Sequence, residues 1–349
     1  MLIAGAASAL PKHKYDQTIL LNALKQFWGA KLDNPQFMQR LHQRVGVETR
    51  HLALPMEQYH AITTWGAANN HWIEVALDLS EEALGLALER SGISKDALGA
   101  IFFVSVTGIA SPSIDARLIN RMKLPLHLKR VPIFGLGCVA GAASVARAAD
   151  YVRAFPDQVA AVIAVELCSL TLQHDDLSVA NLISSGLFGD GAGAALVAGA
   201  EVECSGPRVL ATRSVFYPDT EQVMGWDISE KGFRIVLSRE VPVVVEQFFA
   251  ADVDAFLGAE GLSRTDISGW ILHTGGPRIL EATAQALQLP EGALEASWSC
   301  LRRTGNLSSA SVLLVLEEFL LNRRQPAGSY SLMAAMGPGF CSELLLLQW

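Results

Sequence analysis

The chain contains 349 residues, of which 50% are hydrophobic and 18% charged, so it is long enough for two domains or for one large fold of two joined halves. This composition excludes a disordered, collagen-like or coiled-coil protein. Its 27 Lys and Arg residues are outnumbered by 35 Asp and Glu residues, and the net charge of −8 argues against nucleic acid as a partner.

The N-terminal residues 1–10 are apolar but lack the basic residues that open a signal peptide. The longest uncharged stretch, residues 131–146, is shorter than the roughly 20 residues that cross a bilayer, and Pro132 and several glycines interrupt it. We therefore expect no transmembrane segment. The five cysteines are widely spaced and form no Cys-x-x-Cys pair, which predicts reduced thiols in a cytoplasmic protein without a metal site.

Residues 37–45 predict an amphipathic helix. Arg40 and Arg44 lie one helical turn apart and therefore share a face, while Phe37, Leu41 and Val45 belong to the apolar side. Most such arginines are simply solvated.

Two sets of short apolar segments predict buried strands that alternate with helices, and hence an α/β fold. Segments that are apolar on both faces are typical of strands covered on both sides. The first set comprises residues 100–106, 131–134, 158–165 and 192–197, and the second comprises residues 208–216, 268–272, 330–335 and 344–347. A polar, glycine-containing interruption at residues 199–206 predicts a boundary between halves 1–202 and 203–349. The glycine string at residues 189–193 precedes a strand-like segment and not a helix, so we reject a dinucleotide-binding loop there.

The two sets resemble copies of one another. Residues 104–108 are similar to residues 271–275, and residues 137–142 are similar to residues 305–310, at nearly the same separation. Chance similarity between small residues is the alternative. A true duplication would relate the halves by a pseudo-twofold axis, which would bring Cys138 near Asn306 and add His273 from a strand end.

Cys138 follows a strand and a glycine turn, and it precedes a helix made of small residues. The N-terminus of a helix favours an anion and can lower a thiol pKa into the range of about 3.5 to 7.5, so we expect an activated nucleophile. The alternative is a buried structural cysteine.

His273 and Asn306 are candidates for groups that hold a developing oxyanion. His273 ends an apolar strand before a glycine-rich loop, where an imidazolium could stabilise a thiolate or a neutral ring could donate a hydrogen bond. Asn306 begins a helix, where its amide could cap the helix or donate to the same oxyanion. A core histidine bonded to a carbonyl is the alternative for His273.

These residues and their neighbours resemble the condensing enzymes of the thiolase fold, specifically the chalcone synthase-like type III polyketide synthases. Four segments carry the resemblance: Gly137-Cys138-Val-Ala-Gly, His273-Thr-Gly-Gly-Pro, Gly305-Asn306-Leu-Ser-Ser-Ala and Met336-Gly-Pro-Gly. The resemblance implies a duplicated α/β thiolase-like fold in αβαβα layers and a homodimer. It also implies coenzyme A thioesters as substrates, with neither a metal nor a redox cofactor.

The resemblance further implies a set of substrate contacts. Phe188 and Phe233 match gatekeeper phenylalanines that divide the thiol cavity from the coenzyme A tunnel. Met224 stands where the plant enzymes usually have Gly, and Cys168 where they have Thr. Thr171 and Ser308, in neighbouring motif segments, are expected to line the same cavity.

Coenzyme A contacts follow from the same family pattern. Arg40 and Arg44 match two of three basic positions that bind its phosphates, while Phe37 takes the third. Gly275 and Gly276 are expected to let the coenzyme approach the histidine loop closely.

The implied reaction begins when Cys138 takes a starter acyl group from an acyl-CoA. Malonyl-CoA then loses carbon dioxide, His273 and Asn306 hold the enolate oxygen, and the enolate carbon attacks the Cys138 thioester. Segments 166–171 and 224–228 look like those of bacterial members that extend fatty acyl starters. We therefore expect a medium or long aliphatic starter and an alkylpyrone or alkylresorcinol product.

Three alternatives stay open. One is a polyketide synthase that uses a small or aromatic starter. Another is the ketoacyl synthase III that initiates fatty-acid synthesis, although that enzyme usually carries His-Gln-Ala-Asn where this chain has His273-Thr-Gly-Gly. The third is a catalytically idle acyl-binding scaffold.

Overall fold

The computed structural model describes residues 1–349, in which strands and helices alternate along the chain. The strands are β1 (Leu2–Ala9), β2 (His13–Asp16), β3 (Thr49–Leu52), β4 (Leu98–Val104), β5 (Lys129–Ile133), β6 (Val159–Leu167), β7 (Asp190–Ala198), β8 (Arg208–Phe216), β9 (Met224–Ser229), β10 (Gly232–Leu237), β11 (Ile267–Leu272), β12 (Tyr330–Gly337) and β13 (Cys341–Gln348). The helices are α1 (Gln17–Trp28), α2 (Pro35–Gln43), α3 (Trp65–Ser91), α4 (Ile114–Met122), α5 (Ala140–Ala154), α6 (Val179–Leu187), α7 (Val241–Val244), α8 (Ala250–Ala259), α9 (Pro277–Leu287), α10 (Glu295–Thr304) and α11 (Ser311–Leu321).

The main sheet contains nine strands in the order β11-β12-β13-β8-β1-β7-β6-β4-β5. Its two halves meet at β1 and β8, which share only the pair Leu2 and Arg208. In the N-terminal half β4 is parallel to β6, and β6, β7 and β1 then pair antiparallel. The C-terminal half repeats this pattern with β11, β12, β13 and β8. The predicted duplication is therefore confirmed, with β5 as an additional strand of the first half.

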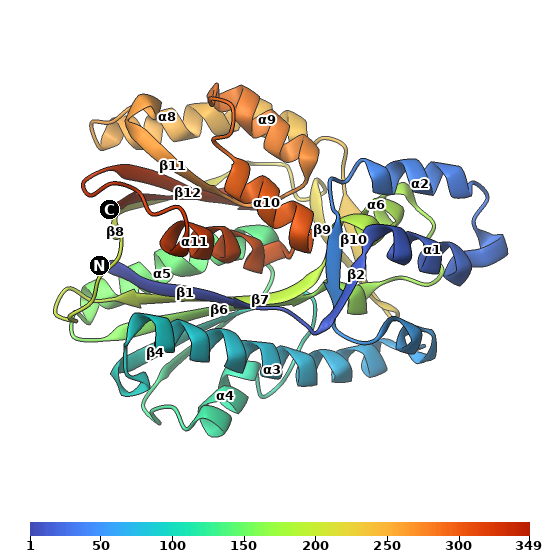
Figure 1. Ribbon diagram of the computed structural model, residues 1–349, viewed down its shortest axis with the longest axis horizontal. Coiled ribbons are helices and arrows are strands. Elements are labelled where there is room, and N and C mark those ends of the chain that lie inside the picture. The colour runs from blue at the N-terminus through green and yellow to red at the C-terminus, as the bar shows by residue number, and fades with distance from the viewer.

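The elements stack in five layers, as predicted (Figure 1). Helices α3 and α4 cover one outer face, and α8 and α9 cover the other. Helices α5 and α11 lie between the two half-sheets and contact strands of both. Helices α1, α2 and α6 and the β9–β10 hairpin gather at one end, opposite the chain termini (Figure 1). This end holds the candidate site.

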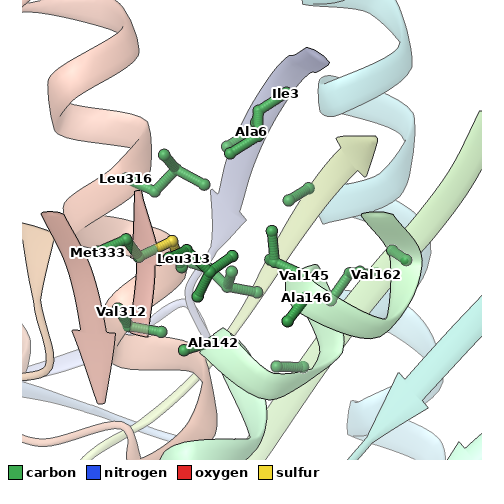
Figure 2. Packing of buried hydrophobic residues seen from close by; sticks show 14 of the residues in the cluster. Ile3, Ala6, Ala142, Val145, Ala146, Val162, Val312, Leu313, Leu316 and Met333 are labelled. Atoms are coloured by element: carbon green, nitrogen blue, oxygen red, sulfur yellow. The ribbon is translucent and has the colours of Figure 1, made fainter. Parts of the chain in front are cut away.

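The central layer is packed from small and branched side chains. Figure 2 shows Ala142, Val145 and Ala146 of α5 facing Val312 and Leu313 of α11, with strand side chains on either side. The two helices touch at Gly141, where an added Cβ would lie 2.2 Å from the Ser309 carbonyl oxygen and 2.8 Å from Val312 Cγ1. Only glycine fits this contact, which holds the start of α5 against the start of α11.

We predict that Gly141→Ala destabilises the protein. The new methyl group would meet backbone, which cannot move aside as a flexible side chain does, so we expect a loss of about 1–3 kcal/mol in the free energy of unfolding. Gly85→Ala in α3 is the matched control, because nothing lies within 4 Å of its added Cβ. That control should gain roughly 0.5–1 kcal/mol from helix propensity. Urea unfolding measures both variants, and equal midpoints would contradict the close contact.

The eight predicted strands are all present, and the glycine string at residues 189–193 leads into β7 without a helix. Strands β1, β2 and β3 and the β9–β10 hairpin were not predicted. Strand β1 is rich in alanine, which has low β propensity, and its pairing with β7 imposes the extended conformation. None of the helices is both long and apolar enough to cross a membrane.

Candidate active site

Cys138 lies where β5 has ended and α5 is about to begin. A 3₁₀ turn over Gly137–Val139 leads directly into α5, and Cys138 is only 6% exposed. Gly137 adopts φ +53°, and an added Cβ there would lie 2.7 Å from Pro338 Cδ. This glycine thus packs the turn that holds Cys138 against the Gly337-Pro338-Gly339 loop. The Cys138 thiol donates to Ser308 Oγ at 3.5 Å.

Asn306 is fixed so that one end of its amide is left free. Its Oδ1 accepts hydrogen bonds from the Ser308 backbone N–H at 2.7 Å and from Ser311 Oγ at 3.5 Å, so it caps the turn that leads into α11. Its Nδ2 donates only to the Gly275 carbonyl, over 3.4 Å. The cap and the free donor are therefore two ends of one side chain, and Nδ2 can turn to a better acceptor.

His273 follows β11 directly, and its backbone N–H donates to the Ala334 carbonyl at 3.0 Å. The side chain is buried, and Nδ1 has no hydrogen-bond partner. His273 lines the adjoining cavity, and with Nδ1 enclosed, Nε2 is the ring nitrogen available to a group bound there.

These three side chains line one cavity of about 500 Å³, which we call the His273 cavity. A second cavity of about 300 Å³, the Cys168 cavity, also includes Cys138 in its wall. Phe188 and Met224 line both cavities and so stand at their boundary. The thiol is thus reached from two sides, one of which carries the histidine and the asparagine.

The electrostatics of the thiol differ from the expectation. Burial raises the pKa of Cys138 to about 12, although the start of a helix predicted a lowered value. Burial also lowers the pKa of His273 to about 4, so the resting pair is a thiol and a neutral imidazole. Both pKa shifts have the same physical cause, because a thiolate or an imidazolium alone would be a single charge in a closed apolar site. Moving the thiol proton to the imidazole creates both charges together, and their mutual attraction offsets part of this cost.

The other expected substrate contacts are distributed over three cavities. Cys168, Thr171 and Ser308 line the Cys168 cavity together with Phe188 and Met224. Phe233 lines neither cavity at the thiol: it is buried against Trp65, Phe134 and Trp226 and borders a third cavity. Of the two expected gatekeepers, only Phe188 lies at the boundary between the His273 cavity and the Cys168 cavity.

The expected coenzyme A contacts divide in the same way. Gly275, Gly276 and Arg44 line the His273 cavity, whereas Arg40 is exposed outside it. Two arginines that the sequence did not suggest, Arg239 and Arg278, line the cavity beside Arg44. The three arginines that line this cavity are all exposed, and none of them forms an ion pair with an acidic side chain.

Glu166 is a buried carboxylate that sequence reasoning passed over. It accepts hydrogen bonds from Ser309 Oγ at 2.5 Å, Thr107 Oγ1 at 2.8 Å and Val106 N at 3.1 Å, and burial raises its pKa to about 7. Because Ser309 belongs to the second half, this network ties the two halves together. It also supports Ser308, whose φ of +47° is unusual for a residue other than glycine.

Comparison with known proteins covers the whole chain. Residues 6–201 match the family model for the N-terminal domain of chalcone and stilbene synthases, and residues 208–349 match the model for the C-terminal domain. The chain is 46% identical over 350 residues to a 1,3,6,8-tetrahydroxynaphthalene synthase of Streptomyces peucetius subsp. caesius, covering 99% of this chain and 93% of that protein.

Two further similarities are informative. A phloroglucinol synthase of Pseudomonas fluorescens is 31% identical, covering 97% of this chain and 96% of that protein. The crystal structure of 1,3,6,8-tetrahydroxynaphthalene synthase from Streptomyces coelicolor A3(2), described as a bacterial type III polyketide synthase, gives a TM-score of 0.95 at 31% identity and covers 100% of this chain and 99% of that chain.

Proposed function

Because the chain belongs to the chalcone and stilbene synthase family and is a type III polyketide synthase, we propose that it condenses malonyl units into a polyhydroxylated aromatic product of the tetrahydroxynaphthalene type. The observation that carries this proposal is the 46% identity, over almost the full chain, to a relative with that product in its name. The family also decides against the ketoacyl synthase III and idle-scaffold alternatives. A homodimer stays a prediction.

Loading of the enzyme transfers an acyl group from coenzyme A to Cys138. His273 takes the thiol proton at Nε2, and the sulfur then attacks the thioester carbon. The carbon–sulfur bond to coenzyme A breaks, and the departing sulfur receives the proton from His273. Because Cys138 and His273 are buried and uncharged before substrate binds, the thiol does not react with electrophiles in solution until a thioester occupies the cavity.

Extension begins when malonyl-CoA occupies the His273 cavity. The bond to the carboxylate breaks, carbon dioxide leaves, and the electron pair moves into the thioester as an enolate. Because Nδ1 of His273 has no hydrogen-bond partner, the neutral ring can carry its proton on either nitrogen. In the tautomer with the proton on Nε2, His273 donates to the enolate oxygen together with Nδ2–H of Asn306, and this oxygen is the group that gains charge. The enolate carbon then attacks the Cys138 thioester, the bond between Sγ and the acyl carbon breaks, and the product, two carbons longer, is held as a coenzyme A thioester. The Cys138 thiolate attacks this thioester, and coenzyme A leaves as a thiolate that takes a proton from water. The lengthened chain is thereby back on Cys138 for the next cycle.

When malonyl-CoA enters through the His273 cavity, the phosphates of its coenzyme A reach three arginines that line this cavity. Arg44 lies just after α2, Arg278 lies in the first turn of α9, and Arg239 lies between β10 and α7. Unpaired guanidinium groups are well suited to phosphate oxygens. We therefore assign coenzyme A phosphate binding to these three arginines and not to Arg40.

We predict that Arg44→Ala combined with Arg278→Ala raises the KM for malonyl-CoA by about three- to tenfold, because exposed ion pairs contribute modestly. The kcat should change less, since these contacts bind substrate and transition state alike. Steady-state kinetics at two salt concentrations measures both constants. Arg324→Ala is the control, because Arg324 is exposed and unpaired but lines none of these cavities. A larger effect from Arg40→Ala than from the double variant would contradict the assignment.

The product is tested by incubating the enzyme with malonyl-CoA alone and analysing the products by mass spectrometry. An aromatic product built entirely from malonyl units supports the proposal. A requirement for a separate acyl-CoA starter would overturn it.

An aliphatic starter is a second candidate, and the lining of the Cys168 cavity favours it. Eighteen of its 31 lining residues are hydrophobic, including Leu20, Leu24, Phe27 and Ile228. A series of acyl-CoA starters, each added with malonyl-CoA, separates the two candidates. Preferential extension of medium or long chains to alkylpyrones or alkylresorcinols would favour this second candidate.

A further inference from the structure

Arg50 is a buried cation in the wall of the Cys168 cavity. It belongs to β3, is only 4% exposed, and lines the same cavity as Cys138. Its Nε donates to Gln17 Oε1 at 3.1 Å, and its Nη1 donates to the Phe188 carbonyl at 2.8 Å. Its Nη2 makes no hydrogen bond and yet is not enclosed by protein atoms. Arg50 lines this cavity, and Nη2 is the one guanidinium nitrogen without a hydrogen-bond partner, so we infer that Nη2 faces the cavity.

The arginine is held close to the residues of the reaction. Its Cγ and Cδ lie 3.3 Å from the position of an added Cβ on Gly305, the residue before Asn306. Phe188, whose carbonyl it binds, is paired with Asn306 in a parallel β-bridge. Arg50 therefore approaches the boundary of the two cavities from the side of the Cys168 cavity.

Asp190 is the acidic side chain whose charge favours the protonated form of Arg50, but its oxygens already accept other hydrogen bonds. Its Oδ1 accepts from the Ser169 N–H at 2.8 Å, and its Oδ2 accepts from the Ala53 N–H at 2.6 Å and from Ser169 Oγ. No hydrogen bond joins it to Arg50. Burial lowers the pKa of Arg50 only to about 10, so the guanidinium is charged at neutral pH. A purely structural arginine at this depth would have its donors occupied, since buried donors rarely lack partners.

We propose that Nη2 of Arg50 binds the carbonyl and enolate oxygens of the polyketone chain carried by Cys138. The inference rests on the proposed function, because only a repeatedly extended chain presents such oxygens inside the cavity. A charged donor would stabilise the enolate form and keep the chain from folding back to a short lactone. An alkyl chain would instead leave Nη2 unpaired and add the cost of a buried free donor. Arg50 is therefore a specificity-determining residue for oxygen-rich chains.

The test compares product distributions in matched variants supplied with malonyl-CoA. Arg50→Gln alone would leave Asp190 without a nearby cation, so we pair it with Asp190→Asn and use Asp190→Asn alone as the reference. In Arg50→Gln/Asp190→Asn the ratio of short lactones to the full-length aromatic product should rise by about tenfold, as expected when one charge-assisted hydrogen bond is lost. An unchanged ratio would overturn the proposal.

Arg50→Lys provides a second measurement if the double variant does not fold. Lysine keeps the charge but replaces the planar fork with a single ammonium group, so a smaller rise of the same ratio is expected. A ratio equal to that of the unmodified enzyme would overturn the proposal. Failure of the proposed function would look different, because the unmodified enzyme would then form no condensed product from malonyl-CoA alone.

Discussion

Cys138→Ala should abolish polyketide formation, with a fall in turnover of at least about 10³-fold. Without the Cys138 sulfur, no atom of the enzyme can carry the growing polyketide between extensions. The substitution removes one sulfur from a buried position, and its only hydrogen bond is the one donated to Ser308 Oγ. The fold should therefore persist. Intact-protein mass after exposure to an acyl-CoA or malonyl-CoA measures the step directly, since the acyl adduct should be absent.

The matched control is Cys204→Ser, which alters another thiol that lines neither the His273 cavity nor the Cys168 cavity. This variant should keep the adduct and the product. Cys168 also lines the Cys168 cavity, so its thiol is the alternative site of acylation. An adduct that survives in Cys138→Ala and disappears in Cys168→Ala would show that the nucleophile is misassigned.

The layered fold could be predicted because local sequence patterns, namely buried strand segments and a repeated motif, indicate it. Strands β4, β6, β7 and β12 are buried on both faces, and most of their residues are accordingly apolar or small. The repeat of the nucleophile and asparagine segments then predicted which helices would meet at the centre. The structure places α5 and α11 there, with Gly141 against Ser309.

The features that the sequence did not predict all depend on packing between distant segments. The raised pKa of Cys138 follows from burial of its turn against the Ser308 turn and the Pro338 loop, which outweighs the start of the helix. Phe233 turns away from the thiol because it packs with three aromatic side chains from other segments. Arg50 is one charged residue in a short strand, a pattern typical of a solvated edge. Its burial becomes evident only once Phe188 and Gly305 lie beside it.

Asn306→Asp and His273→Ala should each slow malonyl-CoA decarboxylation by about 10²–10³-fold, the usual cost of removing one donor from an oxyanion site. The aspartate keeps an oxygen for the Ser308 N–H, so the turn before α11 retains its cap. It loses only the Nδ2–H donor and adds a negative charge where the enolate forms. Carbon dioxide release measures this step separately from condensation.

The order of the effects distinguishes the roles of the three residues. Decarboxylation occurs on malonyl-CoA in the His273 cavity and forms no bond to sulfur, so Cys138→Ala should slow it less than either of the other substitutions does. The pH profile gives an independent check. With its pKa lowered to about 4, His273 is neutral throughout the range from pH 5 to 8 and gains a proton only below it. Decarboxylation should therefore stay level on acidification from pH 8 to pH 5. A transition near pH 6.5, the ordinary pKa of histidine, would mean that the imidazole is solvated and does not lie in a closed apolar site.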